Sequence, residues 1–546
     1  MASQESAVPA PSVTPTPGDA QNNQNRKRGA GQGNRSFKKQ KQKPKRERNM
    51  SEGSTEEVLL ADIEALQKSL EDASPEGAAE APALPEAGSE IDVKVLQLSS
   101  TGDGLAVLEP STRIYVVPFV APGDVARVKV YRHLDDGYSV ADFLSITTPS
   151  PLRDDSRIKC GYFSQCSGCQ FQMLSYDEQL RHKRTIVEKA YRNFSQLPPE
   201  LVPSVADTIG SPLQYGYRTK LTPHFDGPPG HHPSRKKALQ KPFEGVPDIG
   251  FMRKGKRKVI DIEDCPIGTP AVRKGLTRER ARMQTEFGNY SRGATILLRE
   301  STDRRAKGDA PDPVPADVEV VEGEDHVDVK TCVTDNNATT TEYIGSQVFT
   351  NPAGSFFQNN NSILPRFTDY IRSHILPPAS AAGEEIKYLI DAYSGSGLFT
   401  ISLASNFTSS IGIDIADKSI TYARTNASLN GLDTEKCTFL SADANALFAS
   451  VKFPAQQTVV VLDPPRKGCD GNFLRQLLKF GARRVVYVSC NVHTQARDVG
   501  VLVRGEEGPG GARYEIESLV GFDFFPQTGH VEGVAVLNRV EAEKSA

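Results

Sequence analysis

The last part of the chain repeats short apolar runs, and this repetition limits the folds that it can adopt. Four of the runs are Tyr388–Ala392, Ile411–Asp414, Val459–Leu462 and Val485–Val488. They are rich in β-branched residues and too short for helices, which is typical of strands buried on both faces of a sheet. Segments long enough for helices separate them. We therefore predict an α/β, Rossmann-like domain over residues 346–546.

Polar residues stand at the ends of the first strands of this predicted sheet. The turn Tyr393–Gly397 is glycine-rich, so a ligand can approach its backbone closely. Asp414 ends the next strand, where an acid commonly accepts hydrogen bonds from ribose hydroxyls. Asp443 follows a third strand and suits an adenine amino group. Thr400 stands where a dinucleotide motif would place its third glycine, so the pattern favours S-adenosylmethionine over NAD.

Two later strand ends carry residues that suit chemistry at carbon. Asp463 is followed by two prolines and Arg466, a sequence that forms either a simple turn or the wall of a base pocket. Enzymes that methylate amines have an aromatic residue where Arg466 stands. Cys490 follows the strand Val485–Val488 and is either a small core residue or a nucleophile. Together the two segments point away from amine methylation and toward carbon.

Methylation of carbon 5 of uracil explains the choice of residues at these ends. That carbon is a poor nucleophile until a thiolate adds to carbon 6, and Cys490 can supply the thiolate. A base must then remove the carbon 5 proton. Glu532, directly before the apolar run Val534–Leu537, is the candidate, and His530 is the next.

The segment before this domain divides into three parts. Residues 86–150 contain short alternating strands broken by turn residues, which predicts a small OB-like β-barrel. Residues 151–345 form a central α+β domain, in which stretches 226–245 and 302–328 have the composition of loop insertions. Residues 1–85 form a tail and linker. Residues 1–50 have almost nothing to bury, so we expect disorder there.

The tail carries a concentrated positive charge on a chain whose net charge is only −3. Between Arg26 and Arg48 there are 11 Lys and Arg residues against the single Glu47. Three interpretations are open: a nuclear address, a nonspecific RNA contact, or a solvated tail. Ser54 and Glu57 form a capping-box pattern before apolar residues at helical spacing, which predicts a short amphipathic helix.

The chain shows no apolar run long enough for a signal peptide or a membrane helix. We therefore expect an intracellular protein of the nucleus or the cytoplasm, with the mitochondrion as an alternative, and no membrane partner. Eight cysteines in such a chain suggest metal or thiol chemistry rather than disulfides.

Four of the cysteines have the spacing of a metal site. Cys160, Cys166 and Cys169 lie in one loop, and Cys265 follows far downstream. Four thiols can bind zinc or an iron–sulfur cluster, and buried unligated cysteines are the alternative.

Several motifs together resemble a known family. The barrel pattern, with Gly102-Asp103-Gly104 and Pro122-Gly123-Asp124, resembles the TRAM domain, an RNA-binding module. The cysteine loop and the segment Asn351–Asn360, which contains Ser-Phe-Phe-Gln, resemble the RNA 5-methyluridine methyltransferase family. The resemblance covers roughly residues 90–540.

The resemblance implies a fold, a reaction and a set of site residues. It implies a class I methyltransferase domain that uses S-adenosylmethionine, with Cys490 as nucleophile and Glu532 as base. It also implies cofactor contacts and a [4Fe–4S] cluster. The implied cofactor contacts are Gln358, Tyr393, Asp414 and Asp463, and the implied cluster ligands are Cys160, Cys166, Cys169 and Cys265.

The RNA substrate is less sharply defined by the motifs. Eukaryotic relatives of this layout methylate uridine 54 in the T loop of tRNA, so we expect tRNA, with ribosomal RNA as the alternative. An RNA-binding or chaperone protein with a vestigial site is a further alternative. We expect a monomer, and we expect Arg218 and Lys220 of the central domain to contact phosphate.

Overall fold

The computed structural model describes most of the chain after the basic tail. The described residues are 52–72, 83–228, 243–378, 383–442, 448, 450–505 and 512–540. The tail predicted to be disordered and Asp443 lie outside them. No helix in these ranges is both long and apolar enough to span a membrane.

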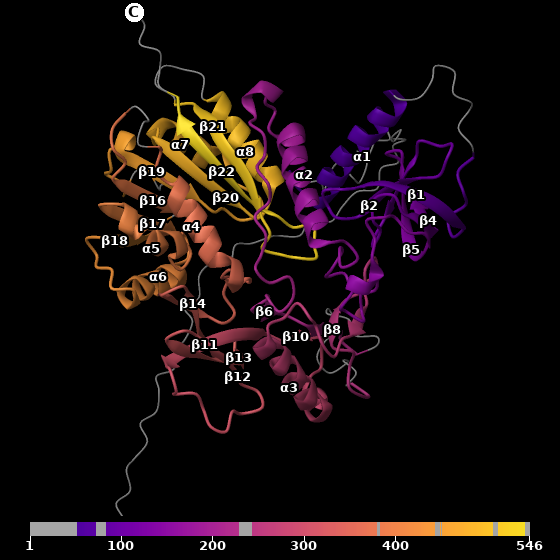
Figure 1. Ribbon diagram of the computed structural model, residues 1–546, viewed down its shortest axis with the longest axis horizontal. Coiled ribbons are helices and arrows are strands. Elements are labelled where there is room, and N and C mark those ends of the chain that lie inside the picture. The colour runs from indigo at the N-terminus through magenta and orange to yellow at the C-terminus, as the bar shows by residue number, and fades with distance from the viewer. Residues whose placement is uncertain are drawn as a thin grey trace, which may run out of the picture. The chain divides into compact units, whose positions relative to one another are not determined.

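A seven-stranded sheet forms the C-terminal domain (Figure 1). Its strand order is β18-β17-β16-β19-β20-β22-β21, in which β22 runs antiparallel to both neighbours and the first five strands are parallel. The strands are β16 (Tyr388–Ala392), β17 (Ser409–Asp414), β18 (Cys437–Ser441), β19 (Thr458–Leu462), β20 (Arg484–Ser489), β21 (Tyr514–Phe522) and β22 (Glu532–Arg539). The Rossmann-like prediction is therefore confirmed.

The continuous apolar runs exist because this sheet is covered on both faces. Along β20, Val485 and Tyr487 pack into one hydrophobic cluster, whereas Val486 and Val488 pack into another on the opposite face. Helix α4 (Leu364–His374) precedes β16, the first strand of the sheet in chain order. The helices that follow individual strands are α5 (Leu398–Ser402), α6 (Asp417–Leu429), α7 (Gly471–Phe480) and α8 (Val492–Arg504). All residues of β19 and β20 are buried.

A closed barrel with strand order β1-β2-β3-β5-β4 precedes the central segment. Its strands are β1 (Glu90–Leu98), β2 (Gly104–Val107), β3 (Ile114–Val117), β4 (Val125–His133) and β5 (Tyr138–Thr148). The predicted N-terminal helix is present as α1 (Thr55–Asp72), and the Ser54 hydroxyl caps it by accepting from Glu57 N at 3.3 Å. Ile63 of α1 is fully buried against barrel residues, so the helix forms part of this unit.

The central segment contains two four-stranded sheets, a β-hairpin and two long helices. The helices are α2 (Tyr176–Phe194) and α3 (Pro270–Glu286). The strands are β6 (Lys220–Leu221), β7 (His224–Phe225), β8 (Gly250–Met252), β9 (Val259–Asp261), β10 (Ala294–Thr295), β11 (Leu298–Ala306), β12 (Glu319–Glu322), β13 (His326–Val333), β14 (Thr339–Ile344) and β15 (Gln347–Pro352). The prediction of a loop insertion at 302–328 is only partly right, because β11, β12 and β13 pair at its ends and only residues 307–318 and the turn 323–325 lie outside any strand or helix.

Helix α2 joins the central segment to the catalytic sheet. In the sequence, Arg181, His182 and Lys183 stand together and predict a basic face for this helix. In the structure, however, His182 and Lys183 are buried, and burial lowers the pKa of His182 to about 3. The Lys183 ammonium donates to Asp523 Oδ1 at 2.5 Å, to Phe525 O at 3.0 Å and to His530 O at 2.6 Å.

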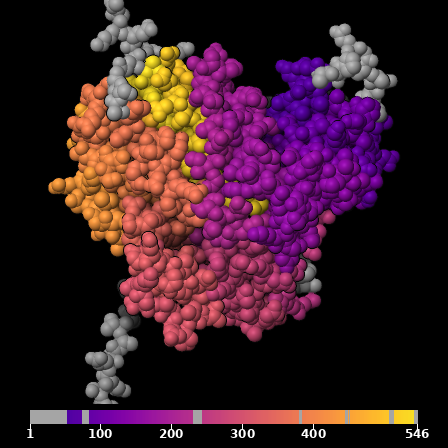
Figure 2. Space-filling model, viewed as in Figure 1, coloured from indigo at the N-terminus to yellow at the C-terminus, as the bar shows by residue number. Residues whose placement is uncertain are grey.

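The acceptors of Lys183 all belong to the loop between β21 and β22. This loop leaves the sheet and passes beneath α2 (Figure 1), and a small yellow patch of the C-terminal part is visible among the magenta and violet atoms in Figure 2. Gln527 O accepts from Gln170 N at 2.7 Å and from Phe171 N at 3.1 Å. The loop is thus anchored by residues far away in the sequence.

Replacing Lys183 by Met should destabilise the protein strongly. Both side chains of the Lys183–Asp523 pair are fully buried, so the variant leaves Asp523 charged and uncompensated in the core. We expect the free energy of unfolding, measured by urea denaturation, to fall by about 3–5 kcal/mol. Arg181→Met on the exposed side of α2 is the matched control and should change it by less than about 1 kcal/mol. A loss in Lys183→Met no larger than in the control would contradict the role of the pair.

Candidate functional site

The turn after β16 forms a cradle in which the backbone itself is exposed to a cavity. Tyr393, Gly395 and Gly397 all have positive φ angles, of 67°, 54° and 93°. For Tyr393 this is an unusual conformation, of the kind that clusters at ligand sites. A Cβ added to Gly395 would meet nothing within 4 Å, so open space lies directly above its backbone.

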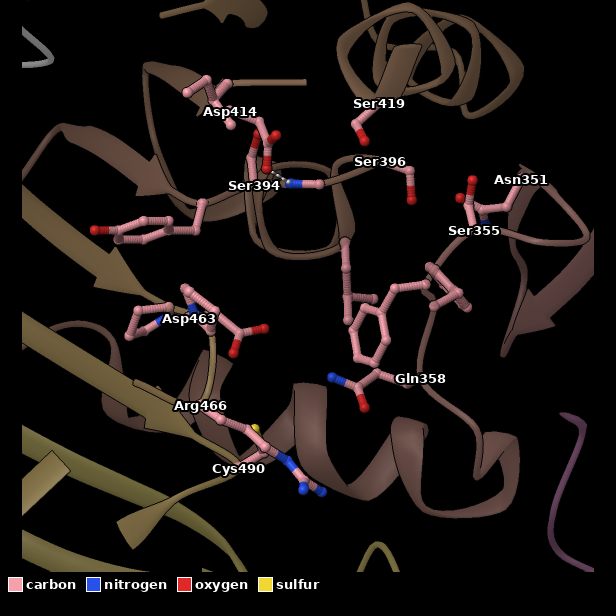
Figure 3. A pocket seen from close by; sticks show the side chains of 18 of the residues that line it. Asn351, Ser355, Gln358, Ser394, Ser396, Asp414, Ser419, Asp463, Arg466 and Cys490 are labelled. Atoms are coloured by element: carbon pink, nitrogen blue, oxygen red, sulfur yellow. Dashed lines mark hydrogen bonds between the residues drawn. The ribbon is translucent and has the colours of Figure 1, made fainter. Parts of the chain in front are cut away.

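Asp414 at the end of β17 fixes the shape of this turn. Its carboxylate accepts from Gly395 N at 3.0 Å, the bond drawn in Figure 3, and from Ala416 N at 2.8 Å. Each oxygen keeps a further lone pair for a ligand hydroxyl. Below the turn, buried Asp391 accepts from Thr400 N at 2.9 Å and from Thr400 Oγ1 at 2.6 Å. A glycine at position 400, as in dinucleotide motifs, could not form the hydroxyl bond to Asp391.

One cavity of about 930 Å³ joins this cradle to the end of β20. It is lined by the six residues that the family resemblance implied for catalysis and methyl-donor binding: Gln358, Tyr393, Asp414, Asp463, Cys490 and Glu532. His530, the alternative base, lines a neighbouring cavity instead. In Figure 3, Asp414, Ser394 and Ser396 lie at one end and Cys490 and Arg466 at the other, with Asp463 and Gln358 between them. The cavity can therefore hold two reactants end to end.

Topology explains why the proposed nucleophile and base lie close together. Cys490 follows β20 directly and Glu532 begins β22, and these neighbouring strands pair Ser489 with Gly533. Glu532 is only 2% exposed, and its Oε1 atom has no hydrogen-bond partner in the described part of the chain. Burial, and then the nearby Asp463 carboxylate, raise the pKa of Glu532 well above its usual range.

The thiol of Cys490 lies in the same electrostatic environment. Burial raises its pKa to about 12, with smaller contributions from Glu532 and Asp463. Arg466 opposes this shift through its charge and a hydrogen bond to the thiol. In the sequence, Arg466 stood out only because it replaces an aromatic residue. Its position could have assigned it to the site, because it follows the Asp-Pro-Pro turn after β19, and the neighbouring strand β20 leads to Cys490.

The cradle fits S-adenosylmethionine, judged on the groups that it presents. The buried Ser394 hydroxyl has no partner among the described residues, and open space lies above Gly395. Two large apolar side chains in the lining, Ile415 and Phe356, are 70% and 75% exposed. Polar groups at a tight turn flanked by apolar surfaces are what a nucleoside requires. Ile415 and Phe356 were not predicted as contacts.

The two basic residues of the central domain have different surroundings. Lys220 donates to Gly354 O at 3.0 Å and to Ser355 O at 3.1 Å, so it supports the loop beside the cradle instead of presenting a free charge. Arg218 lines the cavity, and its guanidinium lies 5.7 Å from the ring centroid of Phe525. The phosphate contact expected for both residues stays a prediction, and Lys220 has one ammonium donor left for it.

The four predicted metal-ligating cysteines share one neighbourhood. Burial raises the pKa of Cys169 and of Cys265 to about 12, and negative charge on the other cysteines of the set raises both further. Gly168 N donates to Cys166 Sγ at 3.4 Å. Within the described ranges, however, no group of three or more His, Cys, Asp or Glu is arranged so that it could hold a metal ion. The donor chemistry of the set fits a thiophilic metal, but the positions of the side chains do not form a ligand shell.

Comparisons with known proteins agree on one family. A family model described as tRNA (Uracil-5-)-methyltransferase matches residues 340–540. The chain is 43% identical over 500 residues to the tRNA (uracil(54)-C(5))-methyltransferase of Schizosaccharomyces pombe, covering 90% of this chain and 85% of the relative. It is 40% identical over 482 residues to the enzyme of the same name from Saccharomyces cerevisiae, covering 82% and 73%.

A solved structure supports the fold over most of the chain. It is the Pyrococcus abyssi tRNA (uracil-54, C5)-methyltransferase in complex with S-adenosyl-L-homocysteine. The similarity has a TM-score of 0.55 at 24% identity and covers 82% of this chain and 100% of that one. It confirms the class I methyltransferase fold that the sequence motifs implied.

The raised pKa of Cys490 predicts how its reactivity depends on pH. Below a pKa of about 12, the thiolate fraction rises about tenfold per pH unit. Alkylation of Cys490 by iodoacetamide should therefore accelerate about tenfold from pH 7 to pH 8 and about tenfold again from pH 8 to pH 9. Mass spectrometry of the Cys490 peptide measures the rate. The same peptide in urea-unfolded protein is the control and should level off near pH 8.5–9. A plateau below pH 9 in the folded protein would show that the pKa is not raised.

Proposed function

The chain belongs to the tRNA (uracil-5-)-methyltransferase family, and on that premise we propose that it methylates carbon 5 of uridine 54 in the T loop of tRNA. One observation supports this most directly. A single cavity connects a nucleoside cradle to a cysteine, a buried carboxylate and an arginine. Two substrates that bind at its two ends meet between Asp463 and Gln358.

The target uridine must leave its RNA loop to reach this cavity. Enzymes that modify a base commonly flip it into a pocket, and loops release a base more easily than helices. The barrel of residues 90–148 resembles TRAM domains, and we propose that it binds the RNA around the target. The barrel would then hold the loop while the base enters.

The first step joins Cys490 to the substrate. Cys490 gives up its proton to solvent, and its sulfur forms a bond to carbon 6 of uracil. The carbon 5–carbon 6 π electrons move to the carbon 4 oxygen, giving an enolate. Arg466 is placed to favour this step, because its guanidinium stabilises the thiolate and adjoins the space where the uracil must lie.

The second half of the reaction restores the ring. S-adenosylmethionine supplies the methyl group, which becomes bonded to carbon 5 while its former bonding pair stays on the donor sulfur. Glu532 then takes the carbon 5 proton, and a new enolate forms. When the double bond returns, the bond from carbon 6 to Cys490 breaks and the thiolate leaves. The raised pKa of Glu532 suits a group that must hold this proton.

Glu532→Gln should trap the enzyme on its product. Addition and methyl transfer need no base, but the carbon 5 proton then has no acceptor, so elimination should slow by ~100- to 10,000-fold. With tRNA and labelled methyl donor, a denaturing gel should show methylated RNA joined covalently to the protein. Cys490→Ala is the matched control: it should bind the methyl donor normally, methylate nothing and form no adduct.

The substrate is tested in the same experiment. A tRNA transcript with cytidine at position 54 should neither be methylated by the wild type nor form an adduct with Glu532→Gln. Methylation of ribosomal RNA in preference to tRNA would show that ribosomal RNA, and not tRNA, is the substrate. Normal turnover by Glu532→Gln would transfer the role of base to another group, with His530 the first to examine.

We further propose that Cys160, Cys166, Cys169 and Cys265 hold a [4Fe–4S] cluster, as the family resemblance implies. Four thiols in mutual electrostatic reach support the proposal. Bound metal keeps cysteine ligands deprotonated, which offsets the burial that raises their pKa values.

Protein purified without oxygen should therefore contain about four iron and four sulfide per chain, and Cys265→Ser should lose most of both. Cys437→Ser, at a buried cysteine of the catalytic domain, is the control and should keep the metal. Zinc in stoichiometric amount, or no metal in protein kept free of oxygen, would overturn the proposal.

A further inference from the structure

A second cavity of about 600 Å³ lies beside the first. Its wall comes from the start of α1, the barrel loop at Ser100, the cysteine loop, and the segments at 490–493 and 529–531. Three residues line both cavities: Arg466, Lys467 and Cys490. Cys490 therefore lies where the two cavities meet. The volume is within the range of about 300–1,000 Å³ that is usual for small-ligand sites.

Helix α1 closes one side of this cavity and is tied to the catalytic domain. Asn491 Nδ2 donates to Gly53 O at 3.1 Å, and Glu52 forms an ion pair with Arg497 at 2.8 Å. The charge of Glu52 is thus offset by a neighbour outside the cavity lining. Helix α1 contributes no residue to the hydrophobic clusters of the catalytic sheet. It completes the wall of the second cavity next to Cys490.

The wall of the second cavity is rich in hydrogen-bonding groups, and two of them have no partner. The Ser100 hydroxyl and His493 Nδ1 are buried, and neither forms a hydrogen bond within the described residues. Ser100 is 7% exposed and His493 is 8% exposed. Buried polar groups without partners are rare in native structures, and a ligand or ordered water commonly supplies the missing partner.

Two cations stand at the junction of the cavities. Arg466 and Lys467 are exposed, and neither forms an ion pair in the part of the chain that the structure describes. In an RNA strand, a phosphate links the target nucleotide to each of its neighbours. When the target base lies against Cys490 in the first cavity, one linking phosphate must lie near this junction. Exposed cations that form no ion pair are the groups that bind phosphate, and the hydrogen bond from Arg466 to the Cys490 thiol leaves further guanidinium N–H donors.

We propose that the second cavity binds the nucleotide adjoining the target uridine in the RNA strand, with Arg466 and Lys467 at the phosphate between the two. This inference rests on the proposed RNA methyltransferase function. It gives the N-terminal helix a role in substrate selection, because the neighbouring base is held partly by residues of α1. Apart from Cys490, which lies at the junction, no residue of the second cavity takes part in the proposed reaction, so we expect the cavity to act on RNA binding.

Thr55→Trp tests the cavity by filling it. Thr55 is exposed and lines the second cavity but not the first, and its hydroxyl forms no hydrogen bond among the described residues. Ser69→Trp is the matched control, because Ser69 is exposed on the same helix and lines neither cavity. Both variants should bind S-adenosylmethionine like the wild type, which also shows that they are folded.

Binding is measured by fluorescence anisotropy with three labelled T-arm hairpins and no methyl donor. One hairpin is intact, one lacks the base 5′ of the target and one lacks the base 3′ of it. The wild type and Ser69→Trp should bind the intact hairpin roughly 5- to 100-fold more tightly than one of the two abasic hairpins. Thr55→Trp should bind the intact hairpin more weakly by a similar factor and lose the preference.

Lys467→Met tests the phosphate contact in the same assay. It should weaken binding of all three hairpins and reduce the slope of log Kd against log salt concentration by about 1. An unchanged slope would remove Lys467 from the proposed junction.

Two results would overturn the proposal. The first is that the wild type binds all three hairpins equally. The second is that Thr55→Trp keeps the wild-type preference for the intact hairpin. In both cases the proposed function would still be supported if the wild type methylates tRNA. If the wild type bound no hairpin and methylated no tRNA, the RNA substrate itself would be wrong and the inference would fall with it.

Discussion

The buried ion pair between Lys183 and Asp523 is the interaction on which the active site depends. Glu532 begins a strand, but the loop before it leaves the catalytic sheet and has no core of its own. Lys183 uses all three of its donors on that loop, including the carbonyl of His530, two residues before Glu532. A fully buried ammonium is tolerated only with such complete pairing. The position of the proposed base is therefore set by a helix of the central segment.

The same loop is held by the residues that follow the cysteine loop. Gln170 donates its backbone N–H to Gln527, accepts from Gly529 N at 2.9 Å and donates from its side chain to Thr101 O of the barrel at 2.8 Å. One glutamine thus links the barrel, the cysteine loop and the loop that leads to Glu532, the proposed base. A disturbance of the cysteine loop would reach the active site by this route.

Burial gives the site its chemical character. Burial raises the pKa of Cys490, Glu532 and Asp463. The two carboxylates raise the pKa of Cys490 further, and Asp463 raises that of Glu532. Arg466 provides the opposing positive charge at Cys490 and Glu532.

The sequence by itself determined the catalytic sheet and the order of its functional ends. Apolar runs such as Val485–Val488 specify buried strands locally, and parallel strands bring their carboxyl ends to one edge whatever lies between them. For that reason Tyr393, Asp414, Asp463 and Cys490 could be placed together without coordinates.

Only the tertiary structure decided what depends on contacts between distant segments. Lys183 looked like part of a basic surface because its sequence neighbours are polar, yet the loop around Asp523 covers it. Residues 302–328 looked like a loop because their composition is polar, yet β11, β12 and β13 pair at the ends of this stretch. The wall of the second cavity beside Cys490 is assembled from helix α1, the barrel, the cysteine loop and the catalytic domain. Sequence patterns report only periodicities within one segment, so no single segment predicts this cavity.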